Sequence, residues 1–380
     1  MARVRRLASQ PFGLYVHVPF CASRCGYCDF NTYTPGELGT SSSPAEYLDA
    51  LERELALAET EPVSSIFIGG GTPSMLGAQG LIRILRAIER EVGIQTGAEI
   101  TTESNPESTS PEFFAQLRDA GYTRISLGMQ SASSKVLQIL GRQHTPGRAF
   151  DAAREALAAG FEHVNLDMIY GTPFERDADV DRTLDEVLAT GVDHVSAYSL
   201  IVEDGTAMAR KVRKGELPEP DEDTYANRYQ MIDERLRSEG FDWYEVSNWA
   251  KPGGQCEHNL LYWRDGNWWG AGPGAHSHID DQRFFNVKHP AKYATMLQGG
   301  HLPVQEREQL SAQQRHEERV MLGLRIAEGL PLGEFSVQER EVVERYRGMG
   351  LVVVGEQVRI SESGRLLADG IIADILAAGA

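Results

Sequence analysis

Three cysteines fall within eight residues in the stretch Cys21-Ala-Ser-Arg-Cys25-Gly-Tyr-Cys28, and the chain has one other cysteine, Cys256. Cysteine thiolates are the usual ligands of iron–sulfur clusters, and a fully ligated [4Fe–4S] cluster takes four of them. The alternative is a zinc site completed by His17 or Cys256. His17 lies on the preceding predicted strand, where alternation decides the direction of its side chain, and no second paired ligand accompanies Cys256. The spacing therefore favours a [4Fe–4S] cluster on Cys21, Cys25 and Cys28, with one iron left open to bind a small molecule.

A glycine motif, Gly69-Gly-Gly-Thr-Pro73, follows the apolar run at residues 64–68. Glycines allow backbone groups to approach a ligand closely. The motif is not a P-loop, because no Lys-Ser/Thr follows, and Ser74 stands where a dinucleotide-binding motif has its third glycine. A tight strand-to-helix turn is the alternative to a ligand site.

An aromatic segment, Cys256-Glu-His-Asn-Leu-Leu-Tyr-Trp263, combines a histidine with flat apolar side chains. A porphyrin pocket needs both an axial nitrogen and flat apolar walls. A core-packing loop with a hydrogen-bonded histidine is the alternative, and the residue types alone favour it slightly for His258.

Short apolar runs alternate with longer stretches whose apolar residues recur every three or four positions. The runs predict strands at 14–18, 64–68, 98–103, 124–128, 163–169 and 194–200, and the stretches predict helices at 44–59, 78–91, 111–120, 147–159 and 178–190. Alternating strands and helices predict a parallel sheet. Six units are too few for an eight-stranded barrel, so the predicted fold is α/β, a partial (β/α)6 barrel.

Functional residues of parallel α/β folds gather at the carboxyl ends of the strands. The cysteine loop, the glycine motif, Glu103 and Asp167 all lie at or near such ends. We therefore expect them to share one site.

The chain divides into three predicted parts. Residues 1–205 would form the barrel with the cluster site, and residues 206–300 would extend it with a helix at 224–240 and the aromatic segment. Residues 301–380 carry helical patterns at 312–327, 336–349 and 362–377, with short strand-like runs at 351–354 and 357–360. This order predicts a small α+β, winged-helix-like module that is structural or protein-binding, since it is not basic.

The chain is acidic, with 37 Lys and Arg against 55 Asp and Glu and a formal net charge of −18. Affinity for nucleic acid comes largely from basic residues on phosphates, so no nucleic-acid partner is expected. Residues 1–7 are basic but precede no apolar signal segment, and no apolar run reaches the roughly 18 residues of a membrane span. We expect a cytoplasmic protein without a transmembrane segment, and the sequence does not decide between a monomer and a homodimer.

The segment that begins Tyr15-Val-His-Val-Pro-Phe and continues through the three cysteines resembles the radical S-adenosylmethionine (SAM) superfamily. Within it, the chain resembles the oxygen-independent coproporphyrinogen III oxidase group over nearly its whole length. In that superfamily SAM chelates the open iron, and an electron from the cluster cleaves it to a 5′-deoxyadenosyl radical. The resemblance thus implies a [4Fe–4S] cluster and SAM as cofactors.

The resemblance also implies which residues contact SAM. The glycine motif matches the segment that holds the SAM amino group, Arg142 would pair with the SAM carboxylate, and carboxylates would accept from the ribose hydroxyls or the ammonium. The implied set is Tyr15, Phe30, Gly70, Gly71, Thr72, Glu103, Gln130, Arg142 and Asp167. For each of them taken alone, an ordinary hydrogen bond at a strand end is the alternative.

Two departures separate the chain from the decarboxylating oxidase. Phe30 stands where that enzyme has another cysteine, and 20 residues precede Cys21 where the enzyme has a longer arm. Both departures, and the motif at 258–263, match the heme-chaperone branch of the group. We therefore expect a protein that binds heme and passes it to recipient hemoproteins, with His258, Asn259, Tyr262 and Trp263 as candidate heme contacts.

Two enzymatic alternatives stay open. The first is an oxygen-independent coproporphyrinogen III dehydrogenase, which decarboxylates two propionates of its substrate through a 5′-deoxyadenosyl radical. The second, less favoured, is a relative of the radical methyltransferases. Whether the chain is an enzyme is therefore undecided from its sequence.

Overall fold

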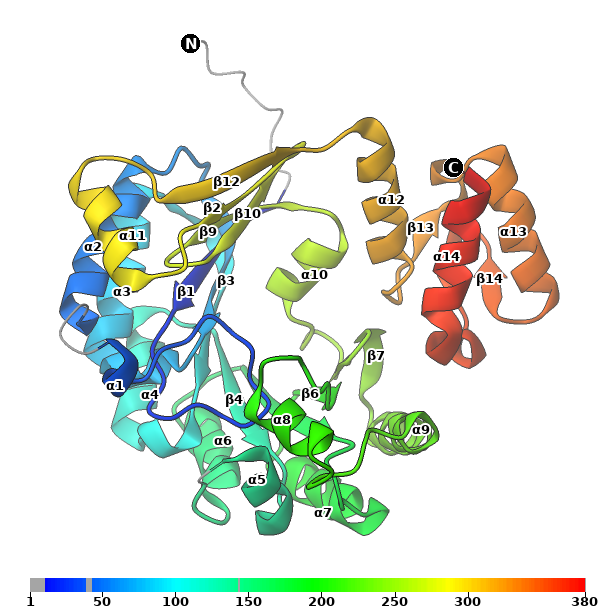
Figure 1. The fold of residues 1–380 in the computed structure, drawn as a ribbon, viewed down its shortest axis with the longest axis horizontal. Helices are drawn as coiled ribbons and strands as arrows, with labels where there is room; N and C mark the ends of the chain where they lie inside the picture. Colours follow the sequence, from blue (N-terminus) through cyan, green and yellow to red (C-terminus); the bar gives the residue numbers. More distant parts are fainter. Residues whose placement is uncertain (1–10, 39–42, 143, 380) are drawn as a thin grey trace.

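A computed structural model describes residues 11–38, 43–142 and 144–379. The basic segment at residues 1–7, considered above as a signal peptide, lies outside the described residues. Six parallel strands lie side by side in chain order, as the sequence predicts (Figure 1). They are β1 (Phe12–Val18), β2 (Val63–Gly70), β3 (Ile94–Ser104), β4 (Arg124–Gln130), β5 (His163–Tyr170) and β6 (His194–Ser199).

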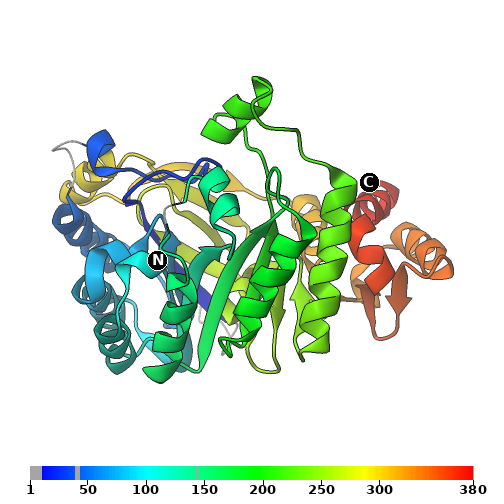
Figure 2. The ribbon, with the colours of Figure 1, turned by 90° about the horizontal axis from the view of Figure 1, so that it is seen from below.

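Helices cover the outer face of these strands, as Figure 2 shows. They are α2 (Pro44–Leu57), α3 (Gly77–Glu91), α4 (Pro111–Ala120), α6 (Arg148–Ala158), α7 (Asp177–Leu188) and α9 (Glu222–Ser238). Local sequence explains their starts: Ser43 and Glu46 form a capping box before α2, and the Ser110 hydroxyl accepts from the backbone N–H of Phe113 before α4. The main hydrophobic core lies between these helices and the sheet. The predicted α/β class and partial barrel are thereby confirmed.

Further strands extend the sheet at both edges. Beside β6 lie β8 (Asn248–Ala250) and β7 (Asp242–Glu245); beside β1 lie β9 (Asn267–Ala271), β10 (His276–Ile279), β11 (Gln282–Asn286) and β12 (Val304–Gln309). The result is a twelve-stranded mixed sheet in which β9 runs parallel to β1 and β8 antiparallel to β6. Helix α11 (Pro290–Gln298) packs on α2. Residues 206–300 were expected to extend the barrel, but no strands were predicted for them, so the strands of this extension were missed.

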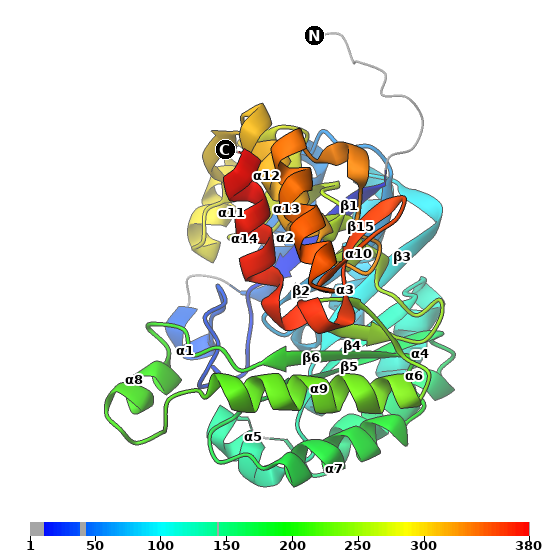
Figure 3. The same cartoon turned by 90° about the vertical axis from the view of Figure 1, so that its right-hand side faces the viewer.

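The C-terminal part has a core of its own and lies to one side of the sheet (Figures 1 and 3). It comprises α12 (Ala312–Gly323), α13 (Val337–Gly348), α14 (Ala368–Gly379) and the small sheet of β13 (Leu330–Pro331), β15 (Gln357–Ile360) and β14 (Val352–Val354). The predicted helix 312–327 ends early, because the backbone N–H of Ala327 donates to Tyr244 O at 2.9 Å. The predicted helix 362–377 starts late, because Glu362–Leu367 form a 3-10 turn capped by Ser361.

The connections after the strands position the site. Short helices α1 (Pro35–Leu38), α5 (Ser134–Leu140) and α8 (Ala207–Arg213) lie beyond the carboxyl ends of the barrel strands, and α10 (Glu257–Trp263) carries the aromatic segment. Among the described residues, no helix combines the length and the apolar character needed to cross a membrane.

Candidate functional site

A cavity of about 830 Å³ occupies the inside of the barrel. Along β3 to β6, every second side chain faces it and most of these are polar, whereas the residues between them pack outward and, except for Thr102, are apolar. The cysteine loop lies over its mouth and the segment around Cys256 closes its far end. The interior of this barrel is thus a cavity with many polar side chains in its wall and not a packed apolar core.

The cysteine loop, drawn in dark blue in Figure 1, is held by contacts from several elements. The Thr72 hydroxyl donates to Cys21 Sγ at 3.7 Å. The backbone N–H of Gly26 donates to Leu140 O at 3.0 Å, and the N–H of Met208, in α8, donates to Gly26 O at 2.8 Å. These contacts fix the shape of the loop.

All three loop cysteines line the cavity and none forms a disulfide. Burial raises the pKa of each thiol, and the nearby Arg142 guanidinium opposes that rise. A bound metal deprotonates a coordinating thiol outright. Three converging thiols beside one cation fit the ligand set of an anionic iron–sulfur cluster.

The glycine motif forms a turn in which Gly70 and Gly71 leave no room for a side chain. Gly70 has a φ of +106°, and a Cβ there would lie 2.6 Å from the His17 ring. A Cβ at Gly71 would lie 2.5 Å from Phe20 O, while Thr72 N–H donates to the same oxygen at 2.7 Å. The turn therefore presents bare backbone to the cavity.

Two buried carboxyl groups face the cavity below this turn. Burial, and next the nearby Asp167 carboxylate, raise the pKa of Glu103 to about 8, although Glu103 Oε2 accepts from Gly70 N–H at 3.0 Å. Burial also raises the pKa of Asp167, which accepts from Asn165 Nδ2 at 2.6 Å and from the Ser126 hydroxyl at 3.1 Å. Carboxyls held in this way favour a cationic or hydroxyl-bearing ligand.

The structure brings together eight of the nine residues that the resemblance implies for SAM. These eight line the cavity: Phe30, Gly70, Gly71, Thr72, Glu103, Gln130, Arg142 and Asp167. Tyr15 lies behind the cavity wall, where its hydroxyl bonds His17 Nδ1 at 3.0 Å and its ring stacks on Phe67, which does line the cavity.

The four candidate heme residues of α10 do different things. His258 is fully buried, with Nδ1 2.9 Å from Ser65 Oγ and Nε2 2.8 Å from the Tyr262 hydroxyl. Burial lowers the pKa of His258 to about 4, so the ring is neutral at pH 7. The ring of Tyr262 also packs edge-on against Trp268, and the Trp263 indole bonds Glu245. Asn259 lines the cavity.

Comparison with known proteins places this geometry in a family. The model of the radical SAM superfamily matches residues 15–187. The heme chaperone HemW of Mycobacterium tuberculosis (strain H37Rv) is 53% identical over 97% of this chain and 96% of its own length. The chain belongs to the HemW family of radical SAM proteins. HemW of Lactococcus lactis is 36% identical over 87% of the chain and 86% of its own length, and HemW of Escherichia coli K12 is 34% identical over 86% and 85%.

The fold extends beyond the HemW family. The structure of coproporphyrinogen III oxidase (HemN) of Escherichia coli, described as a radical SAM enzyme, superposes with a TM-score of 0.84. It covers 98% of this chain and 91% of that one at 23% identity. The likeness shows that the barrel and the C-terminal part share one architecture with HemN.

The far end of the cavity was not predicted from the sequence. Thr101, Arg124, Asn165, His194 and Ser196 line it there. A signal was present in β4, β5 and β6, because polar residues alternate with apolar ones there and period-two alternation marks a strand with two different faces. The runs were interpreted only as buried apolar strands.

A second group of metal-ligand side chains, Asp265, His278 and Glu318, lies outside the cavity. Arg315 Nη2 lies 2.8 Å from Asp265 Oδ2, Arg315 Nη1 lies 2.6 Å from His278 Nε2, and Arg283 pairs with Glu318. These arginines already neutralise the carboxylates, so the group is an ion-pair network.

Proposed function

We propose that this protein is a heme chaperone, which binds heme and a SAM-coordinated [4Fe–4S] cluster and transfers the heme to recipient hemoproteins. The observation that carries the proposal is the 53% identity, over nearly the full length of both chains, to proteins named as heme chaperone HemW. That identity spans the cysteine loop, the barrel and the motif at 258–263.

Cys21, Cys25 and Cys28 would hold the cluster, with Arg142 beside them to offset its charge. The cluster, when bound, supplies an open iron and an electron. The bare turn at Gly70 and Gly71 leaves room for the amino acid end of SAM, and Glu103 and Asp167 are placed to accept hydrogen bonds from its hydroxyl or ammonium groups. Gln130 lines the same space at the end of β4.

The motif at 258–263 would serve heme through two kinds of residue. Asn259 reaches the cavity and would touch the ligand. His258, Tyr262 and Trp263 would act as positioning residues, since their polar atoms bond Ser65, each other and Glu245. This division explains why a buried histidine with two hydrogen-bonded nitrogens stands in a heme-associated segment.

Phe30 supports the chaperone over the porphyrinogen enzyme. Its side chain is 61% exposed at the cavity mouth, at the position where the oxidase has a cysteine. A phenylalanine there offers an apolar contact and no thiol.

The test is anaerobic reconstitution with iron and sulfide, followed by hemin titration and incubation of the heme-loaded protein with an apo-hemoprotein such as apomyoglobin. We expect a saturable Soret band and its movement to the acceptor. Coproporphyrinogen turnover above background, or heme that is never released to an acceptor, would contradict the proposal. Cys25→Ala is the matched variant that separates heme binding from cluster assembly.

A further inference from the structure

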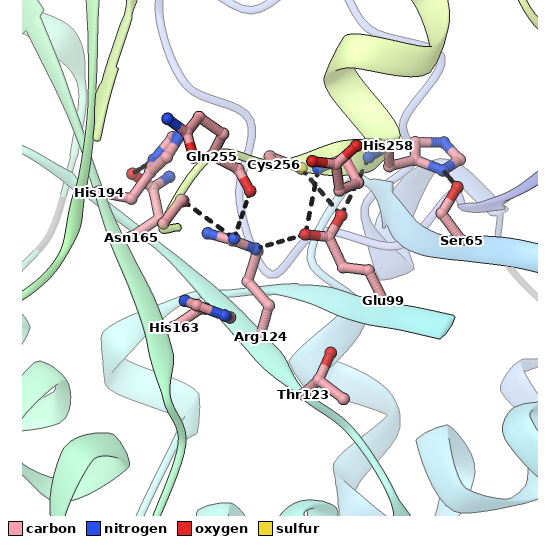
Figure 4. Close-up of polar contacts among 12 residues, drawn as sticks. Ser65, Glu99, Thr123, Arg124, His163, Asn165, His194, Gln255, Cys256 and His258 are labelled. Carbon is pink, nitrogen blue, oxygen red and sulfur yellow. Dashed lines mark hydrogen bonds and ion pairs between the residues drawn. The ribbon is translucent and has the colours of Figure 1, made fainter. Parts of the chain in front are cut away.

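A network of buried polar groups closes the far end of the cavity, as Figure 4 shows. Its centre is Glu99, whose carboxylate accepts from Arg124 Nε at 3.0 Å, from the backbone N–H groups of His258 and Glu257 at 3.0 and 3.2 Å, and from Cys256 Sγ at 3.3 Å. Four donors thus satisfy one carboxylate and fix the start of α10 against β3 and β4.

Arg124 is 2% exposed and is only partly used by this network. Its Nε pairs with Glu99, and its Nη2 donates to Gly254 O at 2.9 Å and to Gln255 O at 2.8 Å. Its Nη1 is buried and has no hydrogen-bond partner among the described residues. A buried donor without a partner costs about 1–3 kcal/mol, so this group calls for a ligand or an ordered water.

Thr101 presents a second unpartnered group beside the first. It is fully buried, and its Oγ1 has no partner in the part of the chain that the structure describes. Thr101 and Arg124 are register partners on β3 and β4, so their side chains leave the sheet next to each other on the cavity side. Asn259 lines the same cavity from α10.

These groups together are donors suited to a planar monoanion. A guanidinium N–H and a hydroxyl can each donate to one oxygen of a carboxylate. The positive charge of Arg124 is already shared with Glu99, which suits a singly charged carboxylate better than a doubly charged phosphate. Figure 4 shows the guanidinium between Glu99 on one side and Asn165 and His194 on the other.

We propose that Arg124 Nη1 and Thr101 Oγ1 form a carboxylate subsite at the closed end of the cavity, and that it holds a propionate of the tetrapyrrole. The inference rests on the proposed function, because heme is the carboxylate-bearing ligand which that function brings into the cavity. Asn259 then links the subsite to the heme-associated motif.

The test compares heme with heme dimethyl ester, in which both propionates are blocked, on the reconstituted full chain. Wild-type protein should bind heme at least about tenfold more tightly than the ester, because only the acid makes the charged hydrogen bonds. Thr101→Val should weaken heme binding roughly tenfold and leave ester binding unchanged.

Thr102→Val is the matched control. Thr102 is equally buried on the same strand, but it lies outside the cavity lining and its hydroxyl bonds Glu103 O at 3.3 Å. Loss of the Thr102 hydroxyl should change neither the affinity for heme nor the affinity for its dimethyl ester. Arg124→Lys keeps the positive charge opposite Glu99 and removes the guanidinium group with its several N–H donors. Like Thr101→Val, it should therefore lower the ratio of the affinity for heme to the affinity for heme dimethyl ester.

Free propionate labelled at its carboxyl carbon is an independent probe, read by the shift of its NMR signal. Equal affinity for heme and its ester, in wild type and Thr101→Val alike, would overturn the tetrapyrrole assignment. If propionate still bound and depended on Thr101, the subsite would hold a small free acid instead. If neither probe responded, Arg124 would hold only water and the inference would be wrong. A wild-type protein that binds no heme would refute the proposed function. The propionate titration would still test whether Arg124 and Thr101 bind a carboxylate.

Discussion

At the scale of single residues, the fourth cysteine lies apart from the other three. Cys256 Sγ contacts Glu99, beside the first residue of β4, whereas Cys21 follows the last residue of β1. A seven-residue strand spans roughly 23 Å, so the two ends of the barrel lie well beyond bonding distance.

Alanine at Cys21, Cys25 or Cys28 should therefore abolish the visible absorbance of the reconstituted cluster. Cys256→Ala should keep both the absorbance and the iron content, and loss of either would contradict the three-cysteine ligand set.

Glu103 predicts a pH dependence of SAM binding. Burial raises the pKa of its carboxyl group to about 8, so the group is mostly protonated at neutral pH. Below pH 8 a cationic ligand beside it must displace that proton, so SAM binding at pH 7 should release up to one proton and tighten as the pH rises towards 9. Calorimetry in buffers of different ionisation enthalpy measures the proton directly.

The matched variant for that measurement is Glu103→Gln, which cannot titrate. Its SAM affinity should be weaker at pH 9 and nearly independent of pH, with no proton released by this group. The same raised pKa destabilises the folded apo protein as pH climbs from about 4.5 to about 8, because the unfolded chain ionises first. Proton release that persists in the variant would assign the effect to another group.

At the scale of elements, strand order and the location of the site follow from the sequence. The six barrel strands have apolar runs of the right length, and the rule that sites lie at carboxyl ends places the cysteines, the glycine turn, Glu103 and Asp167 together. The hollow interior did not follow, because Thr101, Ser126 and Asn165 each resemble an ordinary polar residue within a strand. Only their shared orientation, set by strand register, makes them one surface.

The role of His258 was also beyond the sequence. Its Nδ1 partner, Ser65, lies 193 positions away, on β2. A short sequence pattern cannot predict a contact between residues so far apart in the chain. From the sequence alone, a histidine among aromatic residues could therefore be either a ligand or a packed core residue. The structure places it in the core and brings Asn259 to the cavity.

The glycine turn offers a prediction for an element. Gly71→Ala would place a Cβ 2.5 Å from Phe20 O, and backbone cannot yield as a side chain can. We expect a loss of roughly 1–3 kcal/mol in the free energy of unfolding and weaker SAM binding. Urea denaturation and SAM titration measure the two effects.

Gly36→Ala serves as the control for that change. Gly36 lies in α1, where an added Cβ would meet no other part of the described chain within 4 Å, and its φ is not positive. An alanine there should leave stability equal or slightly higher. If both variants lost the same stability, close packing of the turn would not be the cause.

At the scale of the whole molecule, the C-terminal part has a core of its own and is joined to the barrel by polar contacts. One such contact is made by Arg365, whose Nη1 donates to Asp233 Oδ1 of α9 at 2.9 Å and whose guanidinium lies 4.2 Å from the Trp243 ring centre. Asp233 is buried and also accepts from Trp249 Nε1 at 2.8 Å. Arg365 thus joins the two cores. Further ion pairs cross the same interface: Arg237–Glu362, Arg264–Glu328, Arg315–Asp265 and Arg283–Glu318.

Arg365→Ala should therefore loosen the C-terminal part from the barrel. We expect a loss of about 3 kcal/mol in the free energy of unfolding, from a charged hydrogen bond and a cation–π contact, and earlier cleavage by protease between the two cores.

Arg345→Ala is the control. The ion pair of Arg345 with Asp374 is about half exposed and lies within the C-terminal part, and such exposed pairs contribute at most about 1 kcal/mol. Because the cavity is built by the barrel and α10, the Arg365 variant should still assemble its cluster. A variant that lost the cluster while its unfolding midpoint stayed unchanged would show that the C-terminal part acts on the cavity itself.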